Sequence, residues 1–336
     1  MAINEQEIQD IVRSVLKGMG TTADKPAGSS KKLLGVFDDI NDAIAAAKEA
    51  QKEIQPMPLE FREKIISNIR KKTLENAKMF AELGVEETGM GNVGHKILKH
   101  QLVAEKTPGT EDLSTVAWSG DRGLTLVEMG PFGVIGAVCP STNPTETVVC
   151  NSIGMIAAGN TVVFAPHPSA KNVSNLAIDM INRASVEVGG PENIAVAVTE
   201  PTMEVSKVIF SHKDISLLVA TGGPGVVTTV LSSGKRAMGA GAGNPPVLVD
   251  ETANIPKAAE DIINGCTFDN NLPCIAEKEV VAVDMIADEL IYHMEQVGCY
   301  HANAEEVQKL IKTVFNEKNG KRTLNRQCVG RSAKVL

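Results

Sequence analysis

The sequence predicts an α/β protein built on a doubly wound, mostly parallel sheet, followed by a second α/β unit. Strand-like and helix-like runs alternate between residues 134 and 249, which is typical of parallel sheets whose crossovers are helices. The apolar share of 43% is enough for a sizeable core. With 336 residues, the chain is also long enough for two domains with appendages.

The first 32 residues are predicted to lie apart from the globular part. Apolar residues such as Ile8, Val12 and Met19 recur at helical spacing, so residues 1–19 are predicted to form an amphipathic helix. Residues 20–32 are small and polar, as in a flexible linker. A helix of this kind can dock on a partner or pack on its own domain, and the residues leave both interpretations open.

The globular part is predicted to begin with helices. Asn41 is expected to cap a helix over residues 42–55. The further elements expected before residue 139 are a helix at 59–83, a glycine-rich turn at 89–94, a helix at 97–106, and strands at 125–129 and 134–138.

The alternating region comes next. Its predicted helices cover 145–158, 173–188 and 225–233, and its predicted strands cover 161–164, 194–198, 215–220 and 246–249. Helices at 258–267 and 288–297, with a strand at 279–283, then open the second unit. We therefore expect one domain over residues 33–250 and another over residues 251–336.

Composition excludes several classes of function. The net charge of −8 argues against a nucleic-acid-binding face, and the 3% aromatic content argues against base-stacking platforms. The six cysteines form no Cys-x-x-Cys pair and indicate free thiols in a reducing, cytoplasmic compartment. The six histidines lack metal-ligand spacing, so no metal site is expected. No apolar run has the uninterrupted length of a membrane span, so no membrane partner is expected.

Cys274 is the first candidate for chemistry. The stretch Phe268-Asp-Asn-Asn-Leu-Pro-Cys274 places its thiol after an Asn-rich turn and a proline, at the end of a helix-like run. A Cys presented in this way can act as a nucleophile in covalent catalysis. Most lone cysteines are instead buried apolar residues, and no base stands beside Cys274 in the sequence. The residues alone leave both interpretations open.

Three further turns are candidates. Asn143 lies between a predicted strand and a predicted helix, where its amide could donate to an oxyanion or cap the helix. The turn Thr221-Gly-Gly-Pro-Gly225 could bind a phosphate through backbone N–H groups, or simply connect a strand to a helix. The segment Gly239-Ala-Gly-Ala-Gly243 has so little side-chain bulk that a ligand or a neighbouring backbone could approach it closely.

Several strings resemble the aldehyde dehydrogenase superfamily. They include Pro131-Phe-Gly-Val-Ile-Gly-Ala-Val-Cys-Pro-Ser-Thr-Asn-Pro144 and Ala157-Ala-Gly-Asn-Thr-Val-Val-Phe164. In particular, Gly239-Ala-Gly-Ala-Gly-Asn-Pro-Pro246 and Asp269-Asn-Asn-Leu-Pro-Cys-Ile-Ala-Glu-Lys-Glu279 resemble its CoA-acylating branch, the acetaldehyde and propionaldehyde dehydrogenases of bacterial microcompartments. The resemblance spans about residues 33–330. It implies an aldehyde dehydrogenase-like fold with an NAD-binding domain over 33–250 and the N-terminal part of a catalytic domain over 251–336.

The resemblance also implies roles for individual residues. Cys274 corresponds to the nucleophile and Asn143 to the oxyanion donor. The implied NAD contacts are Ser141, Thr142, Pro166, His167, Thr221, Gly222, Gly223, Gly225 and Gly241. Hydrolytic relatives carry a Lys close to the position of Ala165, and His167 either compensates for that Lys or is an ordinary surface histidine.

The reaction that the resemblance implies is oxidation of acetaldehyde or propionaldehyde with NAD, followed by acyl transfer from Cys274 to coenzyme A. Hydrolytic members use a Glu base on the segment before the glycine-rich loop. No Glu occurs between Glu204 and Glu251, which favours transfer to CoA over transfer to water. The alternatives are a hydrolytic NAD-dependent aldehyde dehydrogenase and a catalytically dead cargo or interaction protein.

Cellular context follows from the resemblance as well. Residues 1–19 are expected to target the protein to a microcompartment lumen by docking on shell or cargo proteins, and the full-length form is expected to be a homo-oligomer. The family's Glu-x-Phe-Gly-Pro motif is absent, and relatives continue well beyond Leu336. We therefore expect a truncated product, a fragment or an incomplete record, with weak stability or misassembly of residues 251–336. The sequence leaves open the aldehyde's length and the choice between NAD and NADP.

Overall fold

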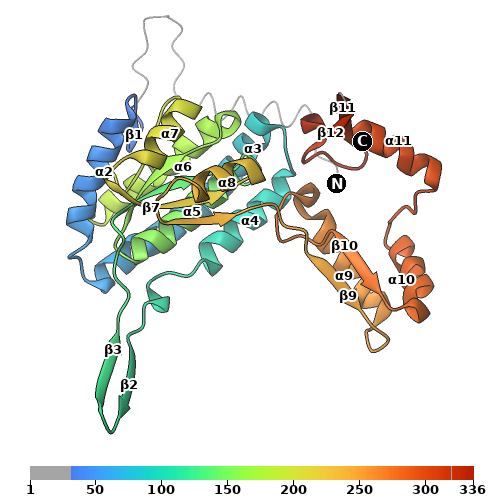
Figure 1. The fold of residues 1–336 in the computed structure, drawn as a ribbon, viewed down its shortest axis with the longest axis horizontal. Coiled ribbons are helices and arrows are strands. Elements are labelled where there is room, and N and C mark those ends of the chain that lie inside the picture. The colour runs from blue at the N-terminus through green and yellow to red at the C-terminus, as the bar shows by residue number, and fades with distance from the viewer. Residues whose placement is uncertain (1–31, 319) are drawn as a thin grey trace, which may run out of the picture. The chain divides into compact units, whose positions relative to one another are not determined.

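The computed structural model describes residues 32–318 and 320–336 (Figure 1). The predicted amphipathic helix at 1–19 and all but the last residue of the predicted linker at 20–32 lie outside the described residues.

A six-stranded sheet is the centre of the first part of the described chain. Its neighbouring strands are all parallel. Their spatial order is β1 (Val36–Phe37), β6 (Ala195–Val198), β5 (Thr161–Ala165), β4 (Val134–Val138), β7 (Ile215–Thr221) and β8 (Ala237–Ala240). Every residue of β5 and of β6 is buried, as expected for inner strands of a parallel sheet covered on both faces.

Seven helices accompany this sheet (Figure 1). They are α2 (Ile40–Ile54), α3 (Leu59–Thr88), α4 (Val93–Lys106), α5 (Pro144–Ala157), α6 (Lys171–Glu187), α7 (Met203–Ser211) and α8 (Pro224–Leu231). Alternate residues of β5 belong to two separate cores: Val162 and Phe164 pack with α3, α5 and α6, whereas Val163 and Ala165 pack with α2 and α7. Since side chains alternate along a strand, helices therefore cover both faces, which confirms the doubly wound α/β prediction.

Helix caps explain where two helices begin. Asp39, not Asn41 as predicted, caps α2, because its carboxylate accepts hydrogen bonds from the backbone N–H groups of Asn41 (2.7 Å) and Asp42 (3.3 Å). Asn92 caps α4 by accepting from the N–H of His95 (3.1 Å). Helix α4 consequently begins four residues earlier than predicted, within the glycine-rich turn.

A smaller parallel sheet starts the second part. It pairs β9 (Pro246–Val249) with β10 (Glu279–Ala282), and its core includes residues of α9 (Ile255–Thr267) and α10 (Asp284–Gln296). The strand at 246–249 was predicted together with the strands of the first sheet, but its partner among the described strands is β10. The elements after α10 are α11 (Ala304–Val314), β11 (Phe315–Lys318), β12 (Lys321–Leu324) and the 3₁₀ helix η4 (Arg326–Cys328).

A hairpin separates the early helices from β4. The 3₁₀ helix η1 (Thr110–Asp112) leads into β2 (Val116–Gly120) and β3 (Gly123–Val127), which pair antiparallel with each other. All ten strand residues of the hairpin are exposed, including Trp118. Among the helices that the structure describes, none combines the length and the apolarity needed to cross a membrane.

Candidate active site

The turn that carries Cys274 has an unusual backbone. Helix α9 ends at Thr267, and the short 3₁₀ segment η3 (Phe268–Asn271) follows it. Asp269, Asn270 and Asn271 have φ angles of 49°, 54° and 59°, so three consecutive residues are left-handed. Asp and Asn tolerate this region better than other non-glycine residues, which gives a physical reason for the Asp-Asn-Asn sequence. Cys274 follows as an exposed residue.

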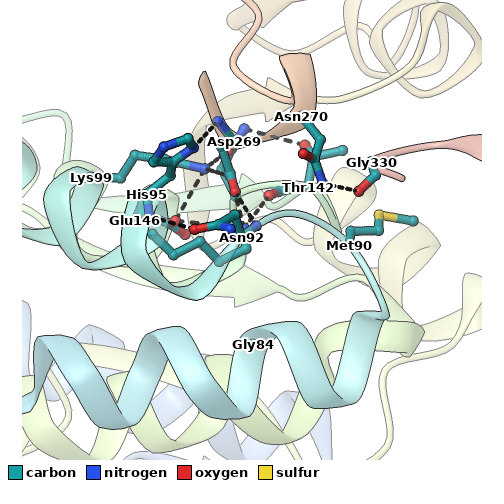
Figure 2. A network of polar contacts seen from close by, with 12 residues as sticks. Gly84, Met90, Asn92, His95, Lys99, Thr142, Glu146, Asp269, Asn270 and Gly330 are labelled. Atoms are coloured by element: carbon teal, nitrogen blue, oxygen red, sulfur yellow. Dashed lines mark hydrogen bonds and ion pairs between the residues drawn. The ribbon is translucent and has the colours of Figure 1, made fainter. Parts of the chain in front are cut away.

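Side-chain hydrogen bonds hold the turn in this conformation. The amide of Asn271 donates to the carbonyl oxygens of Cys266 (2.7 Å) and Glu277 (3.0 Å), which lie on either side of the turn. The amide of Asn270 donates to the carbonyl oxygen of Gly330 (2.9 Å) (Figure 2). These hydrogen bonds link the turn to the chain on either side of it and to Gly330, whose carbonyl oxygen also accepts from the N–H of Gly91 (2.9 Å), and they offset the conformational cost of the left-handed residues.

Asp269 fixes the turn to helix α4. Its side chain is fully buried, and one carboxylate oxygen accepts from the backbone N–H of Asn92 (2.7 Å). The backbone N–H of Asp269 donates to Nδ1 of His95 (2.8 Å), and the His95 ring stacks on Phe268 at 4.8 Å between centroids. The first turn of α4 therefore determines where the turn carrying Cys274 begins (Figure 2).

Four buried charges lie between α4, α5 and this turn. The other oxygen of Asp269 accepts from Nζ of Lys99 (2.6 Å) and of Lys96 (3.2 Å), and Lys99 also lies 3.2 Å from Oε1 of Glu146. The exposed fraction of each of these four side chains is 9% or less. The two positive and two negative charges sum to zero. This neutrality stabilises the site, because an unpaired buried charge is strongly destabilising.

The electrostatics of this cluster keep Glu146 ionised. Burial raises the pKa of Glu146, but the positive charges of Lys99, His100 and Lys96 outweigh burial and lower it to about 2. Burial lowers the pKa of Lys96, and the attraction of Glu146 opposes that shift. We call Lys96, Lys99, Glu146 and Asp269 the buried charge cluster.

Asn143 contacts this cluster rather than the helix that it precedes. It occupies the N-cap position of α5, but its side chain makes no capping hydrogen bond. Its Oδ1 accepts from Nζ of Lys99, and its Nδ2 donates to Oγ1 of Thr142 (3.2 Å). An amide nitrogen has two N–H donors, so Nδ2 keeps a second one for another acceptor. The capping alternative is therefore not what the structure adopts, and the assignment of Asn143 as oxyanion donor stays a prediction.

Gly243 lies against the backbone of Cys274. A Cβ atom added at Gly243 would be 2.2 Å from the carbonyl oxygen of Cys274, which is far inside van der Waals contact. At Gly239, an added Cβ would lie 2.6 Å from a methyl group of Val227. The expectation that the segment 239–243 allows a close approach is confirmed, and the neighbour at Gly243 is the backbone of Cys274.

The predicted NAD contacts all follow the carboxyl ends of parallel strands. Ser141 and Thr142 follow β4, Pro166 and His167 follow β5, the turn at 221–225 ends β7 and begins α8, and Gly241 follows β8. Strand β4 lies between β5 and β7, and the strand order reverses there: from β4 the chain runs through β5 to β6 on one side, and it continues with β7 on the other side of β4. In open parallel sheets, ligands bind at this switch point, outside the carboxyl ends of the strands.

The surroundings of the predicted NAD contacts differ between the glycines and His167. An added Cβ would meet no atom within 4 Å at Gly223, Gly225 or Gly241, so the backbone there is accessible to a large ligand such as a dinucleotide. His167 instead caps the 3₁₀ helix η2 (Pro168–Ala170), since its Nδ1 accepts from the N–H of Ser169 (3.2 Å). Burial and the charge of Arg326 lower the pKa of His167. The NAD-binding role of each of these residues stays a prediction.

Other cysteines differ from Cys274 in their surroundings. All six are free, and Cys150 is the other exposed one. Cys139 is buried, and burial raises the pKa of its thiol. Burial also raises the pKa of Cys266 and of Cys299, which makes their thiolates scarcer.

The segment 205–250 contains no glutamate, and one of its lysines, Lys235, bonds to backbone carbonyl oxygens. Nζ of Lys235 donates to the carbonyl oxygens of His212 (2.9 Å) and Ile215 (2.8 Å). Asp214, a carboxylate in this segment, pairs with Lys48 (2.7 Å) just before the amino end of β7. This end of the strand is opposite to the edge where the predicted cofactor contacts lie.

Sequence reasoning did not find the buried charge cluster. Lys96 and Lys99 are three residues apart on α4, which places them on one helix face, but surface lysines follow the same spacing. Their partner Asp269 is 173 and 170 residues away, and nothing local in the sequence indicates that pairing.

Comparison with known proteins identifies the family of this chain. Residues 34–299 match the model of the aldehyde dehydrogenase family. The chain is 48% identical to an acetaldehyde dehydrogenase (acetylating) of Bilophila wadsworthia, over 100% of this chain and 72% of that protein. It is also 45% identical to a CoA-propanoylating propanal dehydrogenase of Citrobacter freundii, over 99% of this chain and 71% of that protein.

Solved structures give the same result. A propionaldehyde dehydrogenase from the fucose utilisation microcompartment of Clostridium phytofermentans is 67% identical, with a TM-score of 0.86 over 90% of this chain and 69% of that one. A propionaldehyde dehydrogenase of Rhodopseudomonas palustris, solved with bound CoA and an acylated cysteine, is 51% identical, with a TM-score of 0.84 over 89% of this chain and 68% of that one. The predicted resemblance and fold are confirmed: this chain belongs to the aldehyde dehydrogenase family.

Proposed function

We propose that the protein is a CoA-acylating aldehyde dehydrogenase, which oxidises acetaldehyde or propionaldehyde to the acyl-CoA through a thioester on Cys274. The observation that carries this proposal is the exposed Cys274 at the end of a turn that Asp269 and Lys99 tie to Asn143. The relatives support it, since they include acetylating and CoA-propanoylating enzymes.

The residues that would hold NAD are those at the carboxyl ends of β4, β5, β7 and β8. The accessible backbone of Gly223 and Gly225 at the N-terminus of α8 suits a pyrophosphate, because N–H groups there are free of helical partners. NAD supplies the acceptor for the hydride when it is bound. We propose that residues 33–250 form the NAD-binding domain and that residues 251–336 belong to the catalytic domain.

The side chains at Cys274 would carry the acyl chemistry. Its thiolate attacks the aldehyde carbon, and a bond forms between Sγ and that carbon while the carbonyl oxygen becomes an oxyanion. The remaining N–H of Asn143 Nδ2 is the proposed donor to this oxyanion. Loss of hydride leaves the acyl group on Cys274 as a thioester. Attack by the CoA thiolate then releases acyl-CoA and returns the Cys274 thiolate.

The choice between CoA and water depends on a general base. Water needs a base to become a nucleophile, whereas a thiol ionises near neutral pH. The segment 205–250 has no glutamate, and Asp214 is paired with Lys48. We therefore assign the acyl acceptor role to CoA.

The cellular context belongs to the same proposal. We propose that the protein lies in a microcompartment lumen, that residues 1–19 dock on shell or cargo proteins, and that the full-length form is a homo-oligomer. A relative from a bacterial microcompartment supports the location. Removing residues 1–19 should leave the enzyme outside isolated microcompartments, as followed by immunoblotting of the sedimented shells. Unchanged co-sedimentation would refute the docking role.

One assay tests the enzymatic proposal: NADH formation from acetaldehyde or propionaldehyde, with and without CoA. We expect turnover that depends on CoA and disappears in Cys274→Ala. Cys150→Ala is the matched control, because Cys150 is also exposed but lies on α5. Turnover without CoA would indicate the hydrolytic alternative, and no turnover in any condition would indicate a catalytically dead cargo or interaction protein.

A further inference from the structure

Lys99 contacts both halves of the candidate active site. Its Nζ donates to Oδ1 of Asn143 and to Oδ2 of Asp269 (2.6 Å), and it lies 3.2 Å from Oε1 of Glu146. An ammonium group has three donors: Asn143 and Asp269 accept two of them, and Glu146 forms an ion pair with the same group, in a site where the Lys99 side chain is 9% exposed. Lys99 therefore has little conformational freedom.

The contact with Asn143 determines which way its amide faces. An ammonium group only donates, so it stabilises the orientation in which Oδ1 points to Lys99 and Nδ2 points away from it. In the flipped orientation, the NH₂ group would face the ammonium and a charge-assisted hydrogen bond would be lost. Lys99 thereby keeps the donor atom Nδ2 on the side away from the buried charge cluster.

The contact with Asp269 connects Lys99 to the turn that carries the nucleophile. Asp269 is the first of the three left-handed residues, and the chain reaches Cys274 five residues later. One ammonium group thus joins the proposed oxyanion donor on the loop after β4 to the turn that presents the thiol. No other lysine among the described residues bonds to Asn143.

We propose that Lys99 is a positioning residue of the acylation step. It orients the amide of Asn143 towards the developing oxyanion and keeps that amide at a fixed position relative to Cys274. This inference rests on the proposed function, in which Asn143 is the oxyanion donor. Removing one such donor slows acyl chemistry by about 100- to 1,000-fold, and misorienting it should cost about 10- to 100-fold.

Lys96 provides a matched control for the loss of a buried ammonium. It belongs to the same cluster and bonds to Asp269 (3.2 Å) and to the carbonyl oxygen of Thr142 (3.0 Å), but not to Asn143. Each lysine is replaced by Met together with Glu146→Gln, so that both variants keep the cluster neutral and avoid an unpaired buried charge. A thermal melt of each protein establishes that it is folded.

The assay is the burst of p-nitrophenolate when Cys274 is acylated by p-nitrophenyl acetate. In this step the Sγ–carbon bond forms, the carbon–oxygen bond to p-nitrophenolate breaks, and an oxyanion develops in between. The assay needs neither NAD nor CoA, so its outcome is separable from that of the CoA-dependent assay. The burst must be absent in Cys274→Ala.

We expect Lys99→Met/Glu146→Gln to slow the burst by about 10- to 100-fold and Lys96→Met/Glu146→Gln to slow it much less. In an Asn143→Ala background, the Lys99 substitution should have almost no further effect, because residues that act as a unit are non-additive. Full additivity, or equal losses from the two lysine variants, would overturn the positioning role. A wild-type burst without CoA-dependent NADH formation would overturn the proposed function alone, whereas no Cys274-dependent burst would overturn both.

Discussion

Gly243→Ala should inactivate the enzyme without unfolding it. The added Cβ would lie 2.2 Å from the carbonyl oxygen of Cys274 and 3.2 Å from its carbonyl carbon, and both are backbone atoms that no rotamer change can move. The two segments must separate by roughly 1 Å to restore ordinary contact, and a displacement of that size near reacting groups costs about 100-fold in rate.

The measurement is the rate of CoA-dependent NADH formation at saturating aldehyde, with a thermal melt of the same preparation. Gly154→Ala is the control, because Gly154 lies within α5 and an added Cβ there meets no atom within 4 Å. We expect the control to keep its rate and to gain slightly in stability from the better helix propensity of Ala. A Gly243→Ala rate within about threefold of wild type would refute the inference that this contact positions Cys274.

Three further predictions concern the charges and thiols of the same region. Asp269→Asn leaves two buried ammonium groups facing one carboxylate, so urea unfolding should show a loss of about 3–5 kcal/mol in the free energy of unfolding. The control Asp121→Asn, in the exposed hairpin turn, should change that free energy by about 0.5 kcal/mol or less. Equal effects of the two substitutions would contradict a role of the buried charge cluster in stability. The pKa of Glu146 is lowered from 4.5 to about 2 in the folded protein. At pH values above its unfolded pKa, the ionised carboxylate therefore contributes about 3 kcal/mol to the free energy of unfolding. This contribution is lost as the pH falls from about 5 towards 2. The stability difference between wild type and Glu146→Gln should therefore shrink over that range, and a pH-independent difference would show that Glu146 is not held ionised. Iodoacetamide should label the exposed Cys274 and Cys150 at least about tenfold faster than the buried Cys139, as measured by peptide mass spectrometry. Labelling of Cys139 at the same rate in the folded protein would contradict its burial.

The inner strands of the central sheet were predicted well because residues on both of their faces must be apolar. Strands β4 and β5 are apolar at nearly every position because helices cover both faces of the sheet, and their predicted ranges match the structure within one residue. Strand β8 (Ala237–Ala240) was missed, since its Ala, Met and Gly residues are not those that favour strands. Strand β2 was missed because all five of its residues are exposed, so no buried face produces an alternating pattern.

The candidate site was predictable only where a local feature marks it. The Asp-Asn-Asn-Leu-Pro-Cys sequence indicated a special turn, and its left-handed residues are of the types that such a turn requires. The partners of the turn lie far away along the chain: Asn92 and Lys99 on one side, and Gly330 on the other. No periodicity or cap signal relates residues at those separations, so the buried charge cluster became visible only in three dimensions.

The long-range anchoring of the Asp269–Asn271 turn has a consequence for the order of events in folding. Contacts between residues about 170 positions apart form late, because a long loop must close before they contribute any stability. We therefore expect Cys274 to acquire its native geometry only after the central sheet has formed. Pulsed thiol labelling during refolding would show native reactivity of Cys274 appearing after the burial of Cys139; the reverse order would exclude this sequence of events.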